Sequence, residues 1–597
     1  MRHFRGRFLG VLGMVCLTAS LASADVKVDK QPLGAQGESV GCSISPHGGH
    51  VAVLAAKGSR YVVYMDGVAG PRIDALLNTG GSFFTASSPG GWVGEVPILF
   101  SDDGAHWAYC YKSGDDTVIM LDGKEVARGP MQPNLQMPLT FSIGGKHFAW
   151  GYDNRIFMDG KPGPQSRYAP QLFFSPDGSR YAYLGTQPGG NAQWAVVDGR
   201  QVNYFGEINQ FAPNNHLISL LSDPASHSTI FVLDGKPEFK AAGIGRVWTS
   251  PDGKQIAVQL TPDQNSKQVL MVNGKVVPGT EGMGIFNVFF SPDGKRYAVH
   301  CSTPGNSQFM IIDGKKGDEY ASIPEQVGPD NAMQMQWAYP TNTAPLPRIP
   351  AFTADSSKFI YTASAAGRCF LMTEDGEYDD FTGDAGGLAP VLSPVGGHYG
   401  FIGQSTDRKQ AVVIDGKAQV LGQLGVIGQQ IVSCLSFSPD GSHSAFINGT
   451  TLYVDGSPMP GGILGQRYIF SPDGKHIAYY TYQTRLAMDG KLLQTDAMIQ
   501  GAIYAIFSAD SRHVYWITPG QLPNTKDDQQ LFVDGKAVAH FTDIGLGHGA
   551  TFNYEISPEG VLTFITRTDG QLTRFVVTPD SNIDAMLAAA KPVPTTN

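Results

Sequence analysis

Short runs of apolar residues separated by polar turns follow one another along the whole chain, and one segment near its middle shows the pattern in full. Val288–Phe290 is an apolar run, Ser291–Gly294 is polar, and Tyr297–Cys301 alternates. Gln308–Ile312 is a third apolar run, followed by Asp313-Gly314. A period of two predicts strands, Ser-Pro-Asp-Gly predicts a turn, and Asp-Gly predicts a two-residue hairpin. The segment therefore predicts an antiparallel meander of four strands, A to D.

The turn between strands A and B recurs thirteen times along the chain. It is complete, as Phe-Ser-Pro-Asp-Gly-Lys, at Phe290–Lys295. Further copies, from near-perfect to weak, stand at Ile44–Gly49, Phe100–Ala105, Phe141–Lys146, Phe174–Ser179, Phe211–Asn215, Thr249–Lys254, Phe352–Ser357, Leu392–Gly397, Phe437–Ser442, Phe470–Lys475, Phe507–Arg512 and Ile556–Val561. The mean spacing of about 43 residues is typical of propeller blades.

The hairpin between strands C and D recurs in step with this turn. It stands at Asp66-Gly67, Asp122-Gly123, Asp159-Gly160, Asp198-Gly199, Asp234-Gly235, Asn273-Gly274, Asp375-Gly376, Asp415-Gly416, Asp455-Gly456, Asp489-Gly490 and Asp534-Gly535. In a meander the A–B and C–D turns share one end of the blade, which we call the turn end. The B–C and D–A connections share the other, which we call the loop end. Because the irregular sequence falls at the loop end, we expect binding there.

The strand-A motif, as at Ser175–Gly178 and Ser471–Gly474, resembles the TolB-like or WD40-like repeats of secreted bacterial propeller proteins. The resemblance extends over nearly all of the chain after residue 24. It implies an all-β fold of four-stranded antiparallel blades in a protein of the bacterial envelope or secretome. It implies little about activity.

We expect two tandem propellers, because thirteen blades in one ring would leave a wide, empty channel. Residues 25–323 are predicted as a seven-bladed propeller, 324–346 as a proline-rich linker or long loop, and 347–580 as a six-bladed propeller. Residues 581–597 are predicted as a C-terminal tail. The order six then seven remains an alternative. The last repeat lacks a fourth strand of its own, and Val26–Asp29 is a candidate to supply it.

The N-terminus has the pattern of a secretory signal, which we assign to residues 1–24. Three arginines precede the apolar run Phe8–Ala22, and Ala22-Ser23-Ala24 supplies small residues for cleavage. We therefore expect export to the periplasm or the medium. No later stretch is long and apolar enough for a transmembrane helix. The formal net charge of −10 argues against nucleic acid as the partner.

No metal or cofactor is expected. The five cysteines after residue 24 are odd in number and form no Cys-x-x-Cys motif, which favours buried, small apolar residues over zinc or redox sites. An acidic group lacks the spacing of a calcium loop and is only a weak candidate for calcium. Its members are Glu374, Asp375, Glu377, Asp379, Asp380 and Asp384.

The candidate ligand-binding residues are aromatic and lie on two long D–A loops. They are Phe83, Phe84, Trp92, Tyr320, Trp337 and Tyr339. Exposed aromatic side chains can stack on sugars or anchor a protein partner. The alternative is that they cover the rim or pack between the propellers.

A polar residue recurs directly before strand B. It is histidine at His50, His106, His147, His398, His443, His476 and His513, and Arg180, Arg296 and Lys358 stand at the same place elsewhere. Such a set could meet anions. The favoured interpretation is an exposed strand start with local hydrogen bonds.

No catalytic residue is predicted. The Ser-x-Asp-x-Gly-x-x-Trp pattern of sialidase repeats is absent, and no residues remain for an α/β-hydrolase domain. Gly37–Gly41 matches Gly-x-Ser-x-Gly, but no helix signal follows it. We therefore expect a non-catalytic scaffold that binds a protein, peptide or glycan partner through its loop end. The alternative is a carbohydrate-active or other hydrolytic enzyme with its site at a propeller channel mouth, since distant blades can supply paired carboxylates without a local motif.

Overall fold

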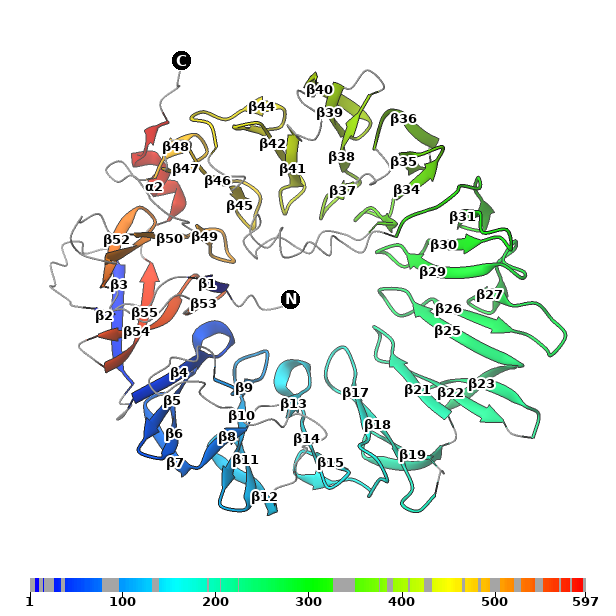
Figure 1. Cartoon of the computed structure of the whole chain (residues 1–597), viewed down its shortest axis with the longest axis horizontal. Coiled ribbons are helices and arrows are strands. Elements are labelled where there is room, and N and C mark those ends of the chain that lie inside the picture. The colour runs from blue at the N-terminus through cyan, green and yellow to red at the C-terminus, as the bar shows by residue number, and fades with distance from the viewer. Residues whose placement is uncertain are drawn as a thin grey trace. The chain divides into compact units, whose positions relative to one another are not determined.

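The strands pair as thirteen antiparallel meanders, which we number blade 1 to blade 13 (Figure 1). This computed structural model describes residues 6–9, 14–15, 26–33, 38–77, 96–130, 139–190, 193–204, 206–223, 225–325, 349–374, 376–383, 390–405, 409–423, 432–463, 468–481, 485–493, 505–519, 528–542, 551–568, 571–579 and 582–593. The predicted all-β fold of four-stranded blades is confirmed. No helix among these residues is long and apolar enough to cross a membrane.

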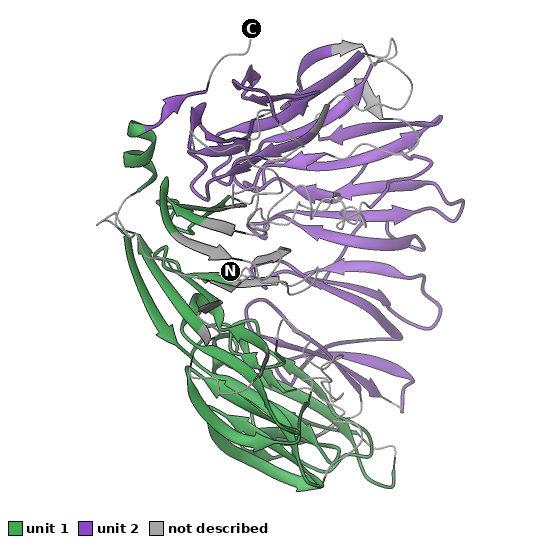
Figure 2. Ribbon diagram, turned by 60° about the vertical axis from the view of Figure 1, so that its left-hand side comes forward, with its two compact units in different colours: residues 1–204, 499–589 green, residues 205–498, 590–597 purple. Residues whose placement is uncertain are grey.

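Two compact units divide the chain, and Figure 2 colours them separately. Unit 1 is Met1–Tyr204 with Ile499–Ala589, and unit 2 is Phe205–Met498 with Ala590–Asn597. Unit 1 therefore contains six blades from the two ends of the chain, and unit 2 contains the seven blades between them.

Unit 1 consists of blade 1 (β4 Glu38–Ile44, β5 Val51–Lys57, β6 Arg60–Met65, β7 Val68–Ile73), blade 2 (β8 Ala75–Leu77, β9 Leu99–Phe100, β10 Trp107–Ser113, β11 Asp116–Leu121, β12 Lys124–Pro130), blade 3 (β13 Thr140–Phe141, β14 Phe148–Tyr152, β15 Arg155–Met158, β16 Lys161–Pro162), blade 4 (β17 Gln171–Phe174, β18 Tyr181–Thr186, β19 Gln193–Val197, β20 Arg200–Tyr204), blade 12 (β49 Ile506–Phe507, β50 Val514–Pro519, β51 Asp528–Val533, β52 Lys536–Thr542) and blade 13 (β53 Thr551–Ile556, β54 Leu562–Thr568, β55 Gln571–Pro579). The short helices η1 (Pro46–Gly48), η2 (Ile143–Gly145) and α2 (Ile583–Ala589) also belong to it.

Unit 2 consists of blade 5 (β21 Gly206–Phe211, β22 Leu217–Asp223, β23 Ser228–Leu233, β24 Lys236–Ala241), blade 6 (β25 Gly243–Thr249, β26 Ile256–Thr261, β27 Val269–Val272, β28 Lys275–Val276), blade 7 (β29 Gly284–Phe290, β30 Tyr297–Ser302, β31 Gln308–Ile312, β32 Lys315–Lys316), blade 8 (β33 Ala351–Phe352, β34 Phe359–Ala365, β35 Arg368–Thr373, β36 Gly376–Gly383), blade 9 (β37 Val391–Leu392, β38 Tyr399–Gln404, β39 Lys409–Ile414, β40 Lys417–Gln423), blade 10 (β41 Val432–Phe437, β42 Ser444–Asn448, β43 Thr451–Val454, β44 Ser457–Pro458) and blade 11 (β45 Tyr468–Phe470, β46 Ile477–Tyr480, β47 Leu486–Met488, β48 Lys491–Leu492), with the fifth strand β56 (Lys591–Pro592) on blade 11.

Blade 13 takes its fourth strand from the N-terminal part of the chain. β3 (Val26–Pro32) pairs antiparallel with β55, from Val26 opposite Pro579 to Pro32 opposite Thr573. This confirms the predicted strand donor. Two further segments, β1 (Gly6–Leu9) and β2 (Met14–Val15), pair with β53 and β54.

Apolar side chains fill the seams between consecutive blades. On β5, Ala52 and Leu54 pack toward blade 2, whereas Val51 and Val53 lie in the cluster that blade 1 shares with Ile565 of blade 13. Both faces of a blade are therefore buried, which explains why strands B and C are apolar at almost every position.

Blades 7 and 8 pack together in the same way, although the predicted linker lies between them in the sequence. Phe289 and Met310 of blade 7 share one cluster with Phe359 and Tyr361 of blade 8. Both blades belong to unit 2, so the division into compact units does not fall at residues 324–346. The assignment of seven blades and then six to separate propellers stays a prediction.

Candidate binding site at the loop end of blade 7

The turn end of each blade is held by a repeated set of hydrogen bonds, as blade 1 shows. The Ser45 hydroxyl accepts the backbone N–H of His50 at 2.8 Å. The carboxylate of Asp66 contacts Nδ1 of His50 at 2.7 Å and accepts the N–H of Val51 at 2.8 Å. A residue of the C–D hairpin thus binds the residues that follow the A–B turn. The prediction that both turns share one end is confirmed.

Equivalent contacts to the hairpin aspartate recur in both units. They join His106 to Asp122, His147 to Asp159, Arg180 to Asp198, His216 to Asp234, Arg296 to Asp313, His398 to Asp415, His443 to Asp455, His476 to Asp489 and His513 to Asp534. The recurrent polar residue therefore makes the local contacts that the favoured interpretation expects.

Blade 6 replaces both members of this pair. Gln255 stands where eleven other blades have histidine, arginine or lysine, and Asn273 stands where those blades have aspartate. Asn273 Oδ1 still accepts the N–H of Ile256 at 3.0 Å, while the Gln255 side chain donates to the carbonyl oxygen of Gly294 in blade 7. In blade 6, therefore, the hairpin residue Asn273 and the residue before strand B, Gln255, are both uncharged amides.

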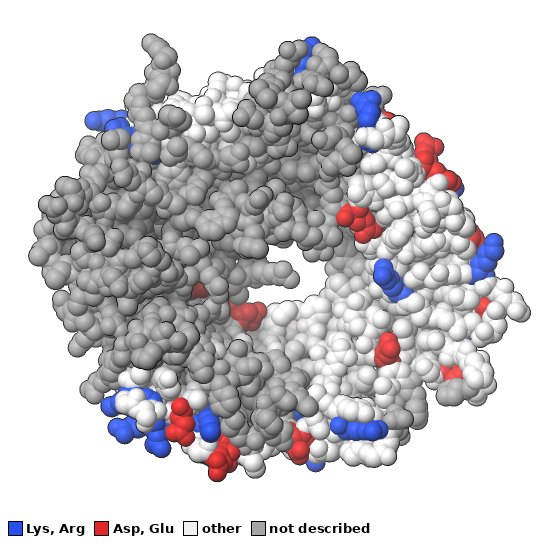
Figure 3. All heavy atoms as spheres, viewed as in Figure 1, with Lys and Arg blue, Asp and Glu red and all other residues white. Residues whose placement is uncertain are grey.

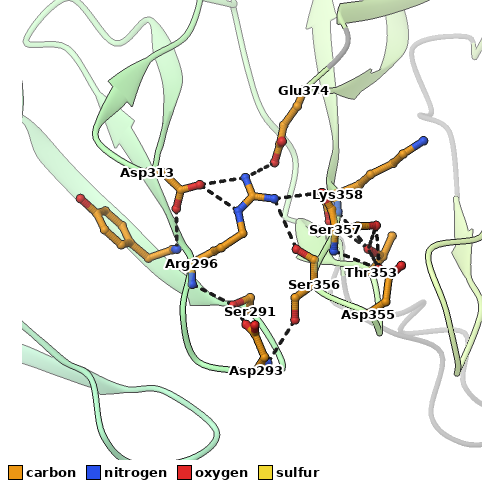
Figure 4. Close-up of polar contacts among 11 residues, drawn as sticks. Ser291, Asp293, Arg296, Asp313, Thr353, Asp355, Ser356, Ser357, Lys358 and Glu374 are labelled. Atoms are coloured by element: carbon orange, nitrogen blue, oxygen red, sulfur yellow. Dashed lines mark hydrogen bonds and ion pairs between the residues drawn. The ribbon is translucent and has the colours of Figure 1, made fainter.

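Arg296 extends the network from blade 7 to blade 8 (Figure 4). Its guanidinium contacts Asp313 of its own blade at 2.8 Å, and it donates to the carbonyl oxygen of Ser357 at 3.0 Å and to Glu374 of blade 8. Glu374 belongs to the acidic group considered for calcium, and here it forms an ion pair with an arginine. Among the described residues, no group of three or more histidine, cysteine or acidic side chains is placed to hold a metal ion.

The aspartates of the A–B turns are hydrogen-bonded within their own turns. For Asp177, the backbone N–H of Ser179 lowers the carboxyl pKa to about 2, with further help from the hydroxyls of Ser175 and Ser179. The Ser250 hydroxyl likewise lowers the pKa of Asp252. These carboxylates therefore stabilise the turns in which they stand.

The five cysteines after residue 24 form no disulfide bond with one another. Cys42, Cys110, Cys301 and Cys369 are buried, as predicted, and Cys434 is half-buried. Burial raises the pKa of the Cys110 thiol to about 12, so the thiolate is scarce at neutral pH.

The aromatic candidates at the loop end are mostly beyond the structural description. Phe83, Phe84, Trp92, Trp337 and Tyr339 lie outside the described residues. Tyr320 is half-buried and packs against the cluster shared by blades 7 and 8. Its backbone pairs with Gln308 of β31, while Ser322 pairs with Ser364 of β34. The segment after β32 thus runs between blades 7 and 8.

Phe286 is the exposed aromatic residue that the structure places at this end of blade 7. In β29, Ile285 pairs with Cys301 and Asn287 with His300, so Phe286 is the extra residue of a β-bulge. A bulge redirects its side chain away from the regular face of a strand, and Phe286 remains 42% exposed. Its ring lies 4.7 Å from that of His300, centroid to centroid. Arg246 of blade 6 donates to its carbonyl oxygen at 3.0 Å.

His300, whose ring contacts that of Phe286, is buried, with 3% of its surface exposed. Its Nδ1 lies 2.8 Å from Oε1 of Glu325, and its Nε2 lies 3.2 Å from Oε1 of Gln308. That amide oxygen also accepts the backbone N–H of Ile323 at 2.6 Å, so Nε2 of His300 must be a donor.

The network continues into blade 6. The side-chain amide of Asn287 donates to Glu325 at 3.4 Å and accepts the indole N–H of Trp248 at 3.0 Å. We call Trp248, Phe286, Asn287, His300, Gln308 and Glu325 the blade 7 cluster. It presents one exposed aromatic ring beside side chains that are hydrogen-bonded to one another.

Sequence reasoning missed this cluster, although a signal was present. At the strand-B position of His300, other repeats have Leu54, Leu184, Ile402 and Ile447. A histidine in a place that is usually apolar marks a departure from the repeat.

On the face drawn in Figure 3, the acidic and basic side chains of the described residues are scattered and form no patch of one sign.

Comparison with known proteins adds no family. No family model matches the chain, and no curated protein does. Among 666 matching chains of solved structures, a eukaryotic initiation factor is 12% identical with a TM-score of 0.25, covering 61% of this chain and 98% of its own. The β-propeller domain of Myceliophteria thermophila Cps50 (Swd1) is 14% identical with a TM-score of 0.20, covering 47% of this chain and 94% of its own. The blades themselves define the class, a β-propeller repeat protein with four-stranded antiparallel blades.

Proposed function

We propose that this protein is an exported, non-catalytic β-propeller scaffold of the TolB-like kind that binds a protein or peptide partner through the loop ends of its blades. The observation that carries the proposal is the bulge of β29, which presents Phe286 beside the buried ring of His300, and His300 in turn contacts Glu325 and Gln308. Exposed aromatic residues on rigid supports commonly dominate the energy of protein interfaces. The turn ends are occupied by their own hydrogen bonds, which leaves the loop ends for recognition.

Site-specific photocrosslinking tests the proposal. A benzophenone amino acid replaces Phe286 in one variant and, as a matched control, Val395 in another. Val395 belongs to the same unit, lies on the A–B turn of blade 9 and is 52% exposed. In an extract of the organism that makes the protein, we expect a discrete polypeptide adduct at position 286 and none at position 395.

A second variant measures the energetic role of the ring. Phe286→Ser is expected to raise the dissociation constant for the crosslinked partner at least tenfold, which is about 1.4 kcal/mol or more. Val395→Ser is expected to leave this dissociation constant unchanged. Equal adducts at both positions, or none at 286, would contradict the proposal. So would hydrolysis of polysaccharides or peptides by the purified protein, which would favour the enzymatic alternative.

A further inference from the structure

Blade 11 carries a strand that its fold does not need. β45–β48 already supply strands A to D, as in the other blades, and β56 adds a fifth strand at the outer edge. Lys491 pairs with Pro592 and Leu492 with Lys591, and the N–H of Val593 donates to the carbonyl oxygen of Gly490 at 2.8 Å. The C-terminal segment thus binds this edge as an extended peptide would.

One side chain of the segment is buried in blade 11. Val593 is 6% exposed and packs in the cluster that includes Ile463 and Leu492. The pocket exists because residue 461 is glycine. A Cβ on Gly461 would lie 2.6 Å from Cγ1 of Val593 and 3.2 Å from Cγ2 of Thr481. Lys591 and Pro592 are exposed, so the segment is held by its backbone and by Val593.

From these observations we propose that the outer edge of blade 11 is a peptide-binding groove. It takes an extended polypeptide with a β-branched apolar residue directly after proline, and residues 591–593 occupy it as an intramolecular ligand. A contact of three residues is weak by itself and depends on the high effective concentration of a tethered segment. A partner with the same chemistry therefore binds by displacing the tail.

The groove belongs to unit 2 and lies at a blade edge, apart from the loop end of blade 7. The proposal is therefore independent of the proposed function, and either can fail without the other.

The test uses the full chain and a fluorescent peptide with the sequence of residues 590–597. In the wild-type chain the tail competes for the groove. In Val593→Asp the tail is released because a carboxylate is costly to bury in an apolar pocket. Fluorescence anisotropy is expected to show at least tenfold tighter peptide binding to the variant than to the wild type. A peptide with aspartate in place of valine is expected to bind neither chain.

A second variant keeps the test sharp. Adding Gly461→Ala to Val593→Asp fills the pocket, so binding of the valine peptide is expected to be lost again. If Val593→Asp folds poorly, Val593→Ser, which weakens the docking of residues 591–593 less strongly, should still bind the valine peptide more tightly than the wild-type chain does. Equal binding of the valine peptide to wild-type and Val593→Asp chains, or equal binding of the valine and aspartate peptides, would overturn the proposal.

Discussion

One residue of the repeat, the hairpin aspartate, both forms the C–D turn and binds the start of strand B. The hairpin aspartate Asp66 adopts a positive φ of 50°, accepts the N–H of Val51 and contacts His50. In blade 6, Asn273 keeps the positive φ and the N–H contact but pairs with no cation. The identity of this residue therefore depends on the turn and on the partner at the start of strand B.

A prediction at this scale concerns acid. The pKa of Asp177 is about 2 in the folded protein and about 3.9 in an unfolded chain. Because the folded pKa is the lower one, its contribution to stability is full above about pH 4 and is lost as the pH falls toward 2. Asp177→Asn should lower the unfolding temperature by about 1–2 °C at pH 7 and make no difference near pH 2. Thermal unfolding followed by circular dichroism measures both.

The control for this prediction is Ser175→Ala, which removes a hydroxyl donor to the same carboxylate. The loss in the double variant should be smaller than the sum of the two single losses, because both substitutions remove the same Ser175–Asp177 hydrogen bond. Additive losses, or an effect of Asp177→Asn that persists at pH 2, would contradict it.

At the scale of elements, the glycine of the A–B turn meets the preceding blade. Gly178 of blade 4 has a positive φ of 70°, and a Cβ there would lie 2.0 Å from the carbonyl oxygen of Ile143 in blade 3. A similar approach occurs at Gly104, whose Cβ would lie 2.4 Å from the carbonyl oxygen of Pro46. The glycine thus serves the turn and also allows neighbouring blades to pack closely.

Two glycines of unit 1 allow the effect of turn geometry to be distinguished from the effect of packing between blades. Gly160, in the C–D hairpin of blade 3, has a φ of 79°, and a Cβ there would meet no atom within 4 Å. Gly160→Ala should cost about 1–2 kcal/mol, the price of a left-handed backbone. Gly178→Ala should cost at least about 3 kcal/mol, because the clash forces the blades apart. Native-state hydrogen exchange of β14 and β18 measures both; equal costs would contradict the role in packing.

Sequence patterns predicted the elements within a blade and missed the contacts between blades and the directions of single side chains. The strands, both turns, their common end and the donor strand near Val26 follow from local periodicity and turn chemistry. The contact that Gly178 makes with blade 3 does not, because a turn already explains a glycine. Phe286 was not found either, since a bulge changes the direction of one side chain without changing the apolar pattern of its strand.

For the whole molecule, the grouping of blades into compact units differs from simple division along the chain. Unit 2 runs from blade 5 to blade 11 through the seam between blades 7 and 8, where Arg296 and the shared apolar cluster join both sides. Unit 1 takes blades from both ends of the sequence. The boundary predicted at residues 324–346 therefore does not coincide with the division between the compact units.

Cleavage between blades 7 and 8 tests this organisation. A specific protease site placed within residues 326–348 would cut the chain without touching the described seam. Because Arg296, Phe289 and Met310 still contact blade 8, and β3 still pairs with β55, we expect the two fragments to co-elute in size-exclusion chromatography until denaturant is added. Fragments that separate and remain folded would instead favour two independent propellers, of seven and six blades.

The pairing of β3 with β55 has a consequence for how the protein is made. A strand synthesised among the earliest residues must wait for residues 571–579 before blade 13 is complete. Until then the nascent polypeptide has an unsatisfied strand edge and an open apolar face, both of which invite aggregation. Blade 13 therefore cannot fold during synthesis in the order of the sequence, and we expect chaperones to bind the exposed strand edge until residues 571–579 have been made.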